Sequence, residues 1–225
     1  MASVGDHAPH PLTPDTTSHH DRGPALALAP ASAGHGAPRR IDHAAVQRAA
    51  RDLLRALGAD VDGAALEETP RRMADAYTEL LTPHAFRATT FPNDDGYDEL
   101  IVARAIPFHS LCMHHLLPFQ GVAHIGYLPG ERIIGLSKLA RVVELYARDL
   151  QIQERLTMQV ADWLQEELAP RGVGVVLEAE HMCMSLRGVA KPGSRTVTSA
   201  LRGAVRDDAR TRQEFMTLTT RTPHD

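Results

Sequence analysis

The order in which apolar patterns follow one another constrains the fold of this 225-residue chain more than any other feature. Helical periodicity comes first, and two stretches of β-type residues follow at 100–108 and 117–129. Two further helical stretches separate these from more β-type residues that begin at 173. Strands that come in pairs, with helices between the pairs, are typical of an antiparallel sheet rather than of alternating βα units. The sequence therefore predicts an α+β fold.

Capping and turn residues predict the boundaries of individual elements. An apolar face that includes Leu53 and Leu54 predicts a first helix, which Gly58 ends. A second helix is expected to open at Thr69, since threonine is a good N-cap and Pro70 suits the first helical position. The other expected elements are a loop at 86–98, an extended piece at 132–135, a helix capped by Ser137 and running to Leu150, a helix at 152–168, strands at 173–181 and 183–190, a strand or loop at 195–205 and a helix at 208–217.

The first 40 residues differ in composition from the rest of the chain. They are rich in proline, alanine, glycine, serine, threonine and histidine, and they contain no aromatic side chain. Such a segment buries too little apolar surface to offset its ordering entropy, so residues 1–40 are expected to form a disordered tail. Its histidines could bind a metal weakly, although a solvated tail is the simpler interpretation. A helical region over 41–98 and a domain that contains the predicted strands, over 99–225, are expected to follow.

Charge, cysteine content and hydropathy exclude several classes of protein. A formal net charge of -4 and a pI near 6.3 argue against a general nucleic-acid binder. The apolar runs are too short to cross a bilayer, and two cysteines are too few for a disulfide-stapled scaffold. The first residues also lack a secretory pattern. We therefore expect a cytoplasmic protein with reduced cysteines and with neither a membrane nor a nucleic-acid partner.

Cysteine and histidine residues occur close together at two places in the chain. Cys112, His114 and His115 lie within four residues, and Cys183 follows about 70 residues later with His181 just before it. Thiolate and imidazole are preferred zinc ligands, and three protein ligands would leave a fourth position for water. The remaining histidines would then be available for proton transfer. The alternative is that the cysteines are buried and never meet the histidines, because this spacing alone is a weak signal.

Basic residues gather near the same positions. A triphosphate requires several cations, ideally beside a helix N-terminus, although each side chain alone is also typical of a solvated surface. Glu154, in the first turn of a predicted helix, suits the helix dipole. Its carboxylate also matches the two adjacent donors on the edge of guanine. The basic residues are Arg71, Arg72, Lys138, Arg141, Arg187, Lys191 and Arg195.

Several longer segments together resemble the GTP cyclohydrolase I family. The resemblance covers residues 41–220 in order, and such a joint match is far more specific than one short motif. The matching runs are EETPRRMADAY (67–77), LCMHHLLPF (111–119), IIGLSKLARVVELYARDLQIQERLT (133–157), EAEHMCMSLRGVAKPGSRTVTSALRG (178–203) and TRQEF (211–215).

The resemblance implies an activity, a fold and an assembly. The family hydrolyses GTP to 7,8-dihydroneopterin triphosphate and releases C8 of the purine as formate. Its fold is the tunnelling fold, in which an antiparallel sheet carries two helices on one side, here preceded by N-terminal helices. Family members assemble as decamers of two stacked pentameric rings. We therefore expect a homo-oligomer whose sites lie at subunit junctions.

The resemblance also implies roles for individual residues, carried over position by position. The expected zinc (Zn2+) ligands are Cys112, His115 and Cys183. The expected catalytic residues are His114, His181 and Ser137, which would assist proton transfers. The expected substrate-binding residues are Glu154 and Gln153 for guanine, and Lys138, Arg141, Arg187 and Arg72, with Ser137, for the triphosphate.

One position departs from the family pattern. The motif usually reads Cys-Glu-His-His, whereas here Met113 stands in place of the acid. Either the acid is dispensable in this subgroup, or the chain is a specialised or silent paralogue that binds zinc and GTP. A third possibility is a related GTP hydrolase that stops after ring opening. The presence of His114, His181 and Glu154 favours the active enzyme over the silent protein, because a silent protein has no need of all three.

Overall fold

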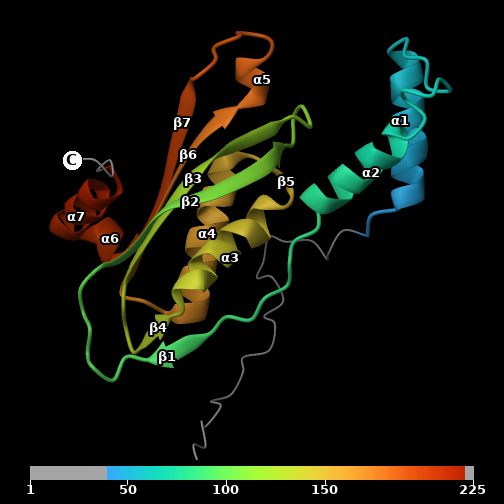
Figure 1. Ribbon diagram of the computed structural model, residues 1–225. Helices are drawn as coiled ribbons and strands as arrows, with labels where there is room; N and C mark the ends of the chain where they lie inside the picture. Colours follow the sequence, from blue (N-terminus) through green and yellow to red (C-terminus); the bar gives the residue numbers. More distant parts are fainter. Residues whose placement is uncertain (1–39, 221–225) are drawn as a thin grey trace, which may run out of the picture.

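A five-stranded sheet forms the centre of the computed structural model, which describes residues 40–220 (Figure 1). The strand order is β5-β2-β3-β6-β7. Its strands are β2 (Ile101–Cys112), β3 (Pro118–Leu128), β5 (Leu150–Gln151), β6 (Gly172–His181) and β7 (Arg195–Gly203). The four long strands pair antiparallel, and only the two-residue β5 runs parallel to its neighbour β2. The predicted α+β fold with an antiparallel sheet is confirmed.

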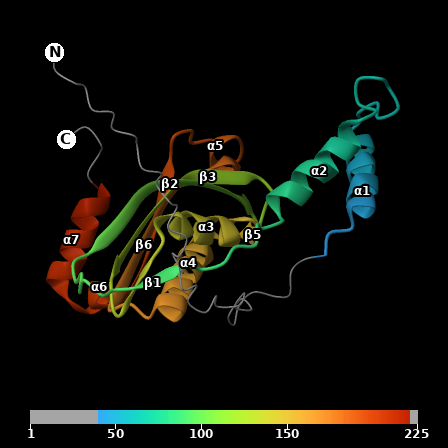
Figure 2. The ribbon, with the colours of Figure 1, turned by 60° about the horizontal axis from the view of Figure 1, so that its bottom comes forward.

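Two helices cover one face of this sheet, as expected. They are α3 (Leu136–Ala147) and α4 (Gln153–Leu168), and both lie on the same side of the strands in Figures 1 and 2. Alternate residues of β6, such as Val173, Val175 and Leu177, point to this side and are fully buried. Leu139 of α3 and Leu156 of α4 belong to the same cluster. This layer between sheet and helices is the main core.

A second, smaller core lies on the opposite face. It is closed by α6 (Ala204–Asp207) and α7 (Ala209–Thr220), which lie at the end of the sheet away from α2 (Figure 1). Phe215 of α7 is fully buried over Gly126 and Gly174, which face each other across β3 and β6. A Cβ atom at Gly174 would come within 2.6 Å of the phenyl ring. Glycine is therefore required beneath this ring.

The N-terminal helices project from the sheet as a separate pair (Figures 1 and 2). They are α1 (His43–Ala56) and α2 (Thr69–Leu80), which pack on each other. The predicted apolar face of α1 is only partly buried in the single chain, because Leu53 is 51% and Leu57 74% exposed. Within residues 40–220, no helix combines the length and the apolar character that crossing a membrane requires.

Several boundaries differ from the sequence prediction, among them the end of β2, which was predicted at Phe108 and lies at Cys112. Helix α3 begins at Leu136 with Gly135 as its N-cap, so Ser137 lies inside the helix rather than capping it, and the helix ends at Ala147 instead of Leu150. The extended backbone of Gly135 is fixed by its N–H, which donates to Thr89 O at 2.9 Å. Helix α2 begins at Thr69, with Glu68 at the N-cap position.

Two segments have a different secondary structure from the one predicted. The stretch 183–190 is not a strand, because α5 (Met182–Ser185) turns the chain directly after β6. The expected loop at 86–98 contains β1 (Thr90–Pro92), which pairs with β4 (Arg132–Ile134). The predicted tail lies, apart from Arg40, outside the described residues, and the predicted division at 98–99 stays a prediction.

Candidate active site

The two Cys/His segments meet at one end of the sheet. Cys112 is the last residue of β2, and His115 lies in the turn to β3, where its N–H donates to Cys112 O at 3.3 Å. Strand β6 is antiparallel to β3, so its last residue, His181, pairs with Phe119 at the start of β3. Helix α5 follows at once and carries Cys183. Strand register therefore brings together residues that are about 70 positions apart.

Three side chains at this point form a group suited to a metal ion. The ligand atoms of Cys112, His115 and Cys183 all lie within 4.8 Å of one another. Cys112 is buried, Cys183 is half-buried and His115 is exposed, so the group opens to solvent on one side. Burial, followed by the nearby Cys112 sulfur, raises the pKa of the Cys183 thiol. A cation would stabilise both thiolates, and two sulfurs with one imidazole are a donor set that zinc prefers.

Two further histidines flank the three ligands. His114 is exposed, and its Nδ1 lies 3.9 Å from Cys112 Sγ. His181 stacks on Phe119, and its Nε2 lies 2.8 Å from Gln153 Oε1. Burial lowers the pKa of His181, while the negative charge of Glu154 acts in the opposite direction. The lowered pKa favours the neutral form of His181, which is the form that accepts a proton.

The first turn of α4 places Gln153 and Glu154 in different environments. Glu154 is exposed beside His181, whereas Gln153 is only 2% exposed. The Gln153 amide donates to Leu177 O and Thr196 O, at 3.1 and 2.9 Å. The described contacts of Gln153 are thus with the protein itself, and its contact with substrate stays a prediction.

The expected triphosphate residues are not brought together by a single chain. Arg187 follows α5, and its charge acts on the Cys183 thiol. Ser137 and Lys138, however, lie at the start of α3, whose other end leads to β5 next to Cys112. Twelve helical residues span about 18 Å at 1.5 Å per residue, and this length separates the two groups. Arg72 lies on α2, outside the sheet.

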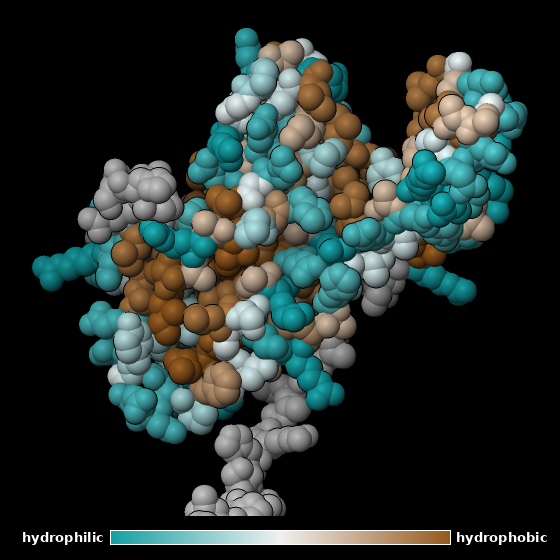
Figure 3. All heavy atoms as spheres, viewed as in Figure 1, coloured by the Kyte–Doolittle hydropathy of each residue, from teal (hydrophilic) through white to brown (hydrophobic). Residues whose placement is uncertain are grey.

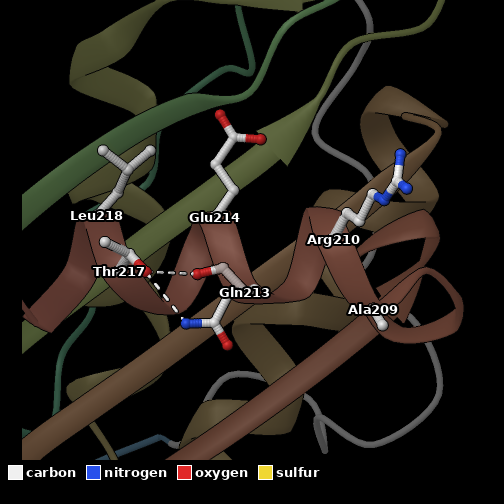
Figure 4. A pocket seen from close by; sticks show the side chains of 6 residues that line it. All are labelled: Ala209, Arg210, Gln213, Glu214, Thr217 and Leu218. Carbon is white, nitrogen blue, oxygen red and sulfur yellow. Dashed lines mark hydrogen bonds between the residues drawn. The ribbon is translucent and has the colours of Figure 1, made fainter.

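Two cavities within residues 40–220 are lined by none of the Cys112, His114, His115, His181 and Cys183 side chains. A depression of about 630 Å³ runs along α7, and Figure 4 shows its lining side chains on that one helix. None of its lining residues is an expected site residue, so we do not assign this depression to catalysis. A smaller cavity of about 240 Å³ between β2 and α3 includes Arg141, Phe108 and Arg148. Arg141 is the expected site residue that this cavity contains.

Sequence reasoning did not single out two residues that shape the site. Phe119 provides the flat surface on which His181 lies. Glu180 Oε1 accepts hydrogen bonds from Ser185 Oγ at 2.6 Å and from Gly193 N at 3.1 Å, and so ties α5 and the following loop to β6. Strand alternation alone could have placed Phe119 and His181 on the same face of the sheet, but not in the same register position.

An antiparallel sheet with two helices on one face and a Cys-His-Cys group at its end defines a tunnelling-fold protein with a potential metal centre. The family model for GTP cyclohydrolase I matches residues 46–220. This chain belongs to that family.

Curated relatives agree with the family assignment over nearly their whole length. GTP cyclohydrolase 1 of Mycobacteroides abscessus is 50% identical over 196 residues, which cover 84% of this chain and 95% of that protein. GTP cyclohydrolase 1 of Streptomyces avermitilis is 53% identical, with 82% and 94% covered. The Aquifex aeolicus protein of the same name is 49% identical, with 79% and 97% covered.

Proposed function

We propose that this chain hydrolyses GTP and rearranges it to 7,8-dihydroneopterin triphosphate with release of formate, the first step of tetrahydrofolate and pterin biosynthesis. The observation that carries this proposal is the meeting of Cys112, His115 and Cys183 beside His114 and His181, in a chain about half identical to curated GTP cyclohydrolases.

Cys112, His115 and Cys183 would hold a zinc ion. Their donor types suit zinc, and their half-exposed arrangement leaves room for a fourth, non-protein ligand. A zinc ion held there supplies Lewis acidity, which makes water a nucleophile at neutral pH.

The two flanking histidines supply proton transfer. His181 in its neutral form accepts a proton as water adds to C8 of the purine. It then returns the proton to the ring nitrogen whose bond to C8 breaks, and this cleavage opens the imidazole ring. A second hydrolysis releases C8 as formate. His114 and Ser137 assist the later proton transfers, in which the ribose opens to a ketone and the freed amine closes on it.

Charged residues orient the substrate. The Glu154 carboxylate is exposed near His181 and accepts hydrogen bonds from the N1–H and the exocyclic amino group of guanine. Lys138, Arg141, Arg187 and Arg72, with Ser137, bind the triphosphate and keep the intermediates in place. Gln153, which is buried next to Glu154 in the first turn of α4, supports the guanine-binding part of the site.

A complete site requires more than one chain. Because about 18 Å of α3 separates Ser137 and Lys138 from the metal group of the same chain, the α3 cations serve a pocket completed by a neighbour. Exposed apolar side chains near α5 and β7, including Leu186, Val189 and Val197, are available for such a contact. Figure 3 shows further apolar surface on the face of the sheet viewed there. We therefore propose a homo-oligomer, a decamer with sites at subunit junctions.

The compartment follows from the chemistry of the substrate and the thiols. We place the enzyme in the cytoplasm, where GTP is available and Cys112 and Cys183 stay reduced.

Product analysis tests the function directly. Purified zinc-loaded protein incubated with GTP is expected to release one formate for each pterin, with the pterin detected by fluorescence after oxidation. Formate without a fluorescent product would instead identify an enzyme that stops after ring opening. Neither formate nor pterin would identify a silent paralogue.

A further inference from the structure

The side-chain amide of Gln153 joins three elements of the fold. Its Nε2, at the start of α4, lies within 3.1 Å of Leu177 O on β6 and of two atoms on β7, Thr196 O and Thr198 Oγ1. Its Oε1 lies 2.8 Å from His181 Nε2. The amide is buried, so these contacts are made away from bulk water. They decide how the amide is oriented.

The carbonyl partners allow only one orientation of this amide. Leu177 and Thr196 present carbonyl oxygens, which accept hydrogen bonds and cannot donate them, so the NH₂ group of Gln153 must face them. The reversed amide would set its oxygen against both carbonyls in a buried place. Oε1 of Gln153 therefore faces His181, and an amide oxygen only accepts.

The neighbouring hydroxyl groups agree with this assignment. Thr157 Oγ1 donates to Gln153 O at 2.7 Å and lies 2.7 Å from Thr198 Oγ1. Since the Thr157 hydrogen is used, Thr198 must be the donor of that pair. The Thr198 oxygen can then accept from Gln153 Nε2 by sharing one of its two N–H groups with a carbonyl, and the donors and acceptors of the set are mutually consistent.

We propose that Gln153 is a positioning residue that holds the proton of His181 on Nε2 and leaves Nδ1 as the basic ring nitrogen. The proposal rests on the proposed function for the role of His181 in proton transfer. The two nitrogens point to different sides of the imidazole, so Nδ1 faces away from the buried amide. The Phe119 ring, 4.6 Å from the His181 ring and inclined to it by 3°, fixes the plane in which Nδ1 points.

In this role Gln153 contacts His181 at Nε2, the ring nitrogen that does not take the substrate proton. Glu154 then recognises guanine. A histidine that must accept a proton needs its free lone pair aimed at the substrate, and an imidazole with the proton on the other nitrogen presents an N–H there instead. Removing the acceptor is thus expected to lower kcat far more than it changes KM for GTP.

The tautomer can be measured without any turnover. Zinc-loaded protein carrying 15N-labelled histidine is examined by solid-state NMR at about pH 8.5, where imidazole is neutral. The His181 signals are identified by their loss in His181→Asn. We expect a protonated Nε2 and an unprotonated Nδ1 in the wild type. A protonated Nδ1 would overturn the proposal, whether or not the protein acts on GTP.

Two variants then test the role of the amide. Gln153→Met keeps the size of the side chain but offers no amide oxygen; His181 should lose its single tautomer, and kcat should fall about tenfold to a hundredfold. Thr198→Val is the matched control, because it removes one acceptor of the same NH₂ group while both carbonyls remain; it should keep the wild-type tautomer and most of kcat. Unchanged ring signals and kcat in Gln153→Met would refute the positioning role.

The outcomes separate this inference from the proposed function. A wild type that releases no formate from GTP contradicts the function but leaves the tautomer measurement intact. A wild type that is active but carries its His181 proton on Nδ1 contradicts only the inference. If Gln153→Met does not fold, the tautomer measured in the wild type and in Thr198→Val still decides the inference, because a protonated Nδ1 in either protein overturns it.

Discussion

Phe119 and His181 lie face to face across strands β3 and β6, with ring centroids 4.6 Å apart and ring planes 3° from parallel. Phe119 is fully buried, so it offers a fixed surface to a histidine that is itself partly open to solvent. The pair stands at the end of the same row of inward-facing residues that forms the main core. The rigidity of the core thus extends to the ring nearest the Cys/His group.

Loss of one thiol is expected to remove the metal. Cys183→Ser replaces a zinc-binding thiolate by a hydroxyl, so the metal content should fall from about one equivalent per chain towards none. Metal analysis of the purified protein measures this directly. Met184→Ser, one residue further along α5, should keep its zinc. Full metal content in Cys183→Ser would refute the ligand assignment.

Guanine selection is expected to depend on the charge of Glu154. An amide can accept only one of the two hydrogen bonds that the carboxylate accepts from the guanine edge, at a cost of about 1.5–3 kcal/mol for a charged contact. In Glu154→Gln, kcat/KM for GTP should therefore fall about tenfold to a hundredfold, while the oligomeric mass stays the same. Glu166→Gln is the control: it changes an exposed carboxylate on the same helix and should keep the wild-type kcat/KM for GTP. Wild-type kinetics in Glu154→Gln would contradict the assignment.

The methionine of the Cys-Met-His-His motif is expected to be compatible with activity. The Met113 N–H donates to Gln151 O at 3.0 Å, and its side chain is 44% exposed, so it does not fill the metal group. The wild type should release formate from GTP, and Met113→Glu should change kcat by less than about tenfold, within the range of a peripheral charge. A wild type without formate release that Met113→Glu alone restores would establish the silent paralogue.

Glu180 is expected to support the metal group from the back of β6. Its hydrogen bonds from Ser185 and Gly193 favour the ionised carboxylate and lower its pKa below the ordinary 4.5. Because the pKa of Glu180 is lower in the folded state than in the unfolded state, the carboxylate stabilises the fold at every pH above the unfolded-state pKa. This stabilisation is lost as the pH falls through the lower, folded-state pKa. The Tm difference between wild type and Glu180→Gln should therefore persist from pH 7 to about 5 and shrink below 4.5.

The same substitution should loosen the zinc site at neutral pH. Without the carboxylate, α5 is held less firmly against β6, and zinc affinity measured by chelator competition should fall about tenfold. Glu178→Gln is the matched control, because Glu178 lies on the same strand and pairs with Arg195 rather than with α5. Equal zinc affinities for both variants and the wild type would show that the Glu180 contacts do not matter to the site.

The packing of α7 is expected to depend on one aromatic ring. Phe215→Ala would leave a cavity over Gly126 and Gly174, and a buried Phe→Ala change costs about 3–5 kcal/mol. Thermal unfolding should show a clearly lower Tm. Glu214→Ala, exposed on the same helix, should leave it nearly unchanged. Equal Tm values for the two variants would show that α7 contributes little to stability.

Long periodic segments were predictable from sequence, whereas short ones were not. Strands β2, β3 and β6 and helix α4 were found because alternation or helical periodicity extends over ten or more residues. The two to four residues of β1, β5 and α5 carry no period, and α5 owes its turn to the chain reversal after β6. Ser137 was placed at a helix N-terminus because serine is a common N-cap, but Gly135 holds that position.

The candidate site followed from resemblance rather than from spacing. Nothing local in the sequence tells that Cys112 and Cys183 meet, because their approach depends on the pairing of β3 with β6. The burial of Gln153 was equally hidden, since its partners belong to Leu177 and Thr196 on strands that follow it in the chain. Register over the whole sheet, which is a tertiary property, decides both.

The length of α3 has a genetic consequence. In the proposed assembly, a pocket can take its metal ligands from the product of one allele and its α3 cations from the product of another when two alleles are expressed together. A pocket that takes its metal ligands from a Lys138 variant and its α3 cations from a Cys183 variant would then carry neither defect. Two null alleles of these kinds would complement each other in part, whereas two alleles that both damage the metal ligands would not.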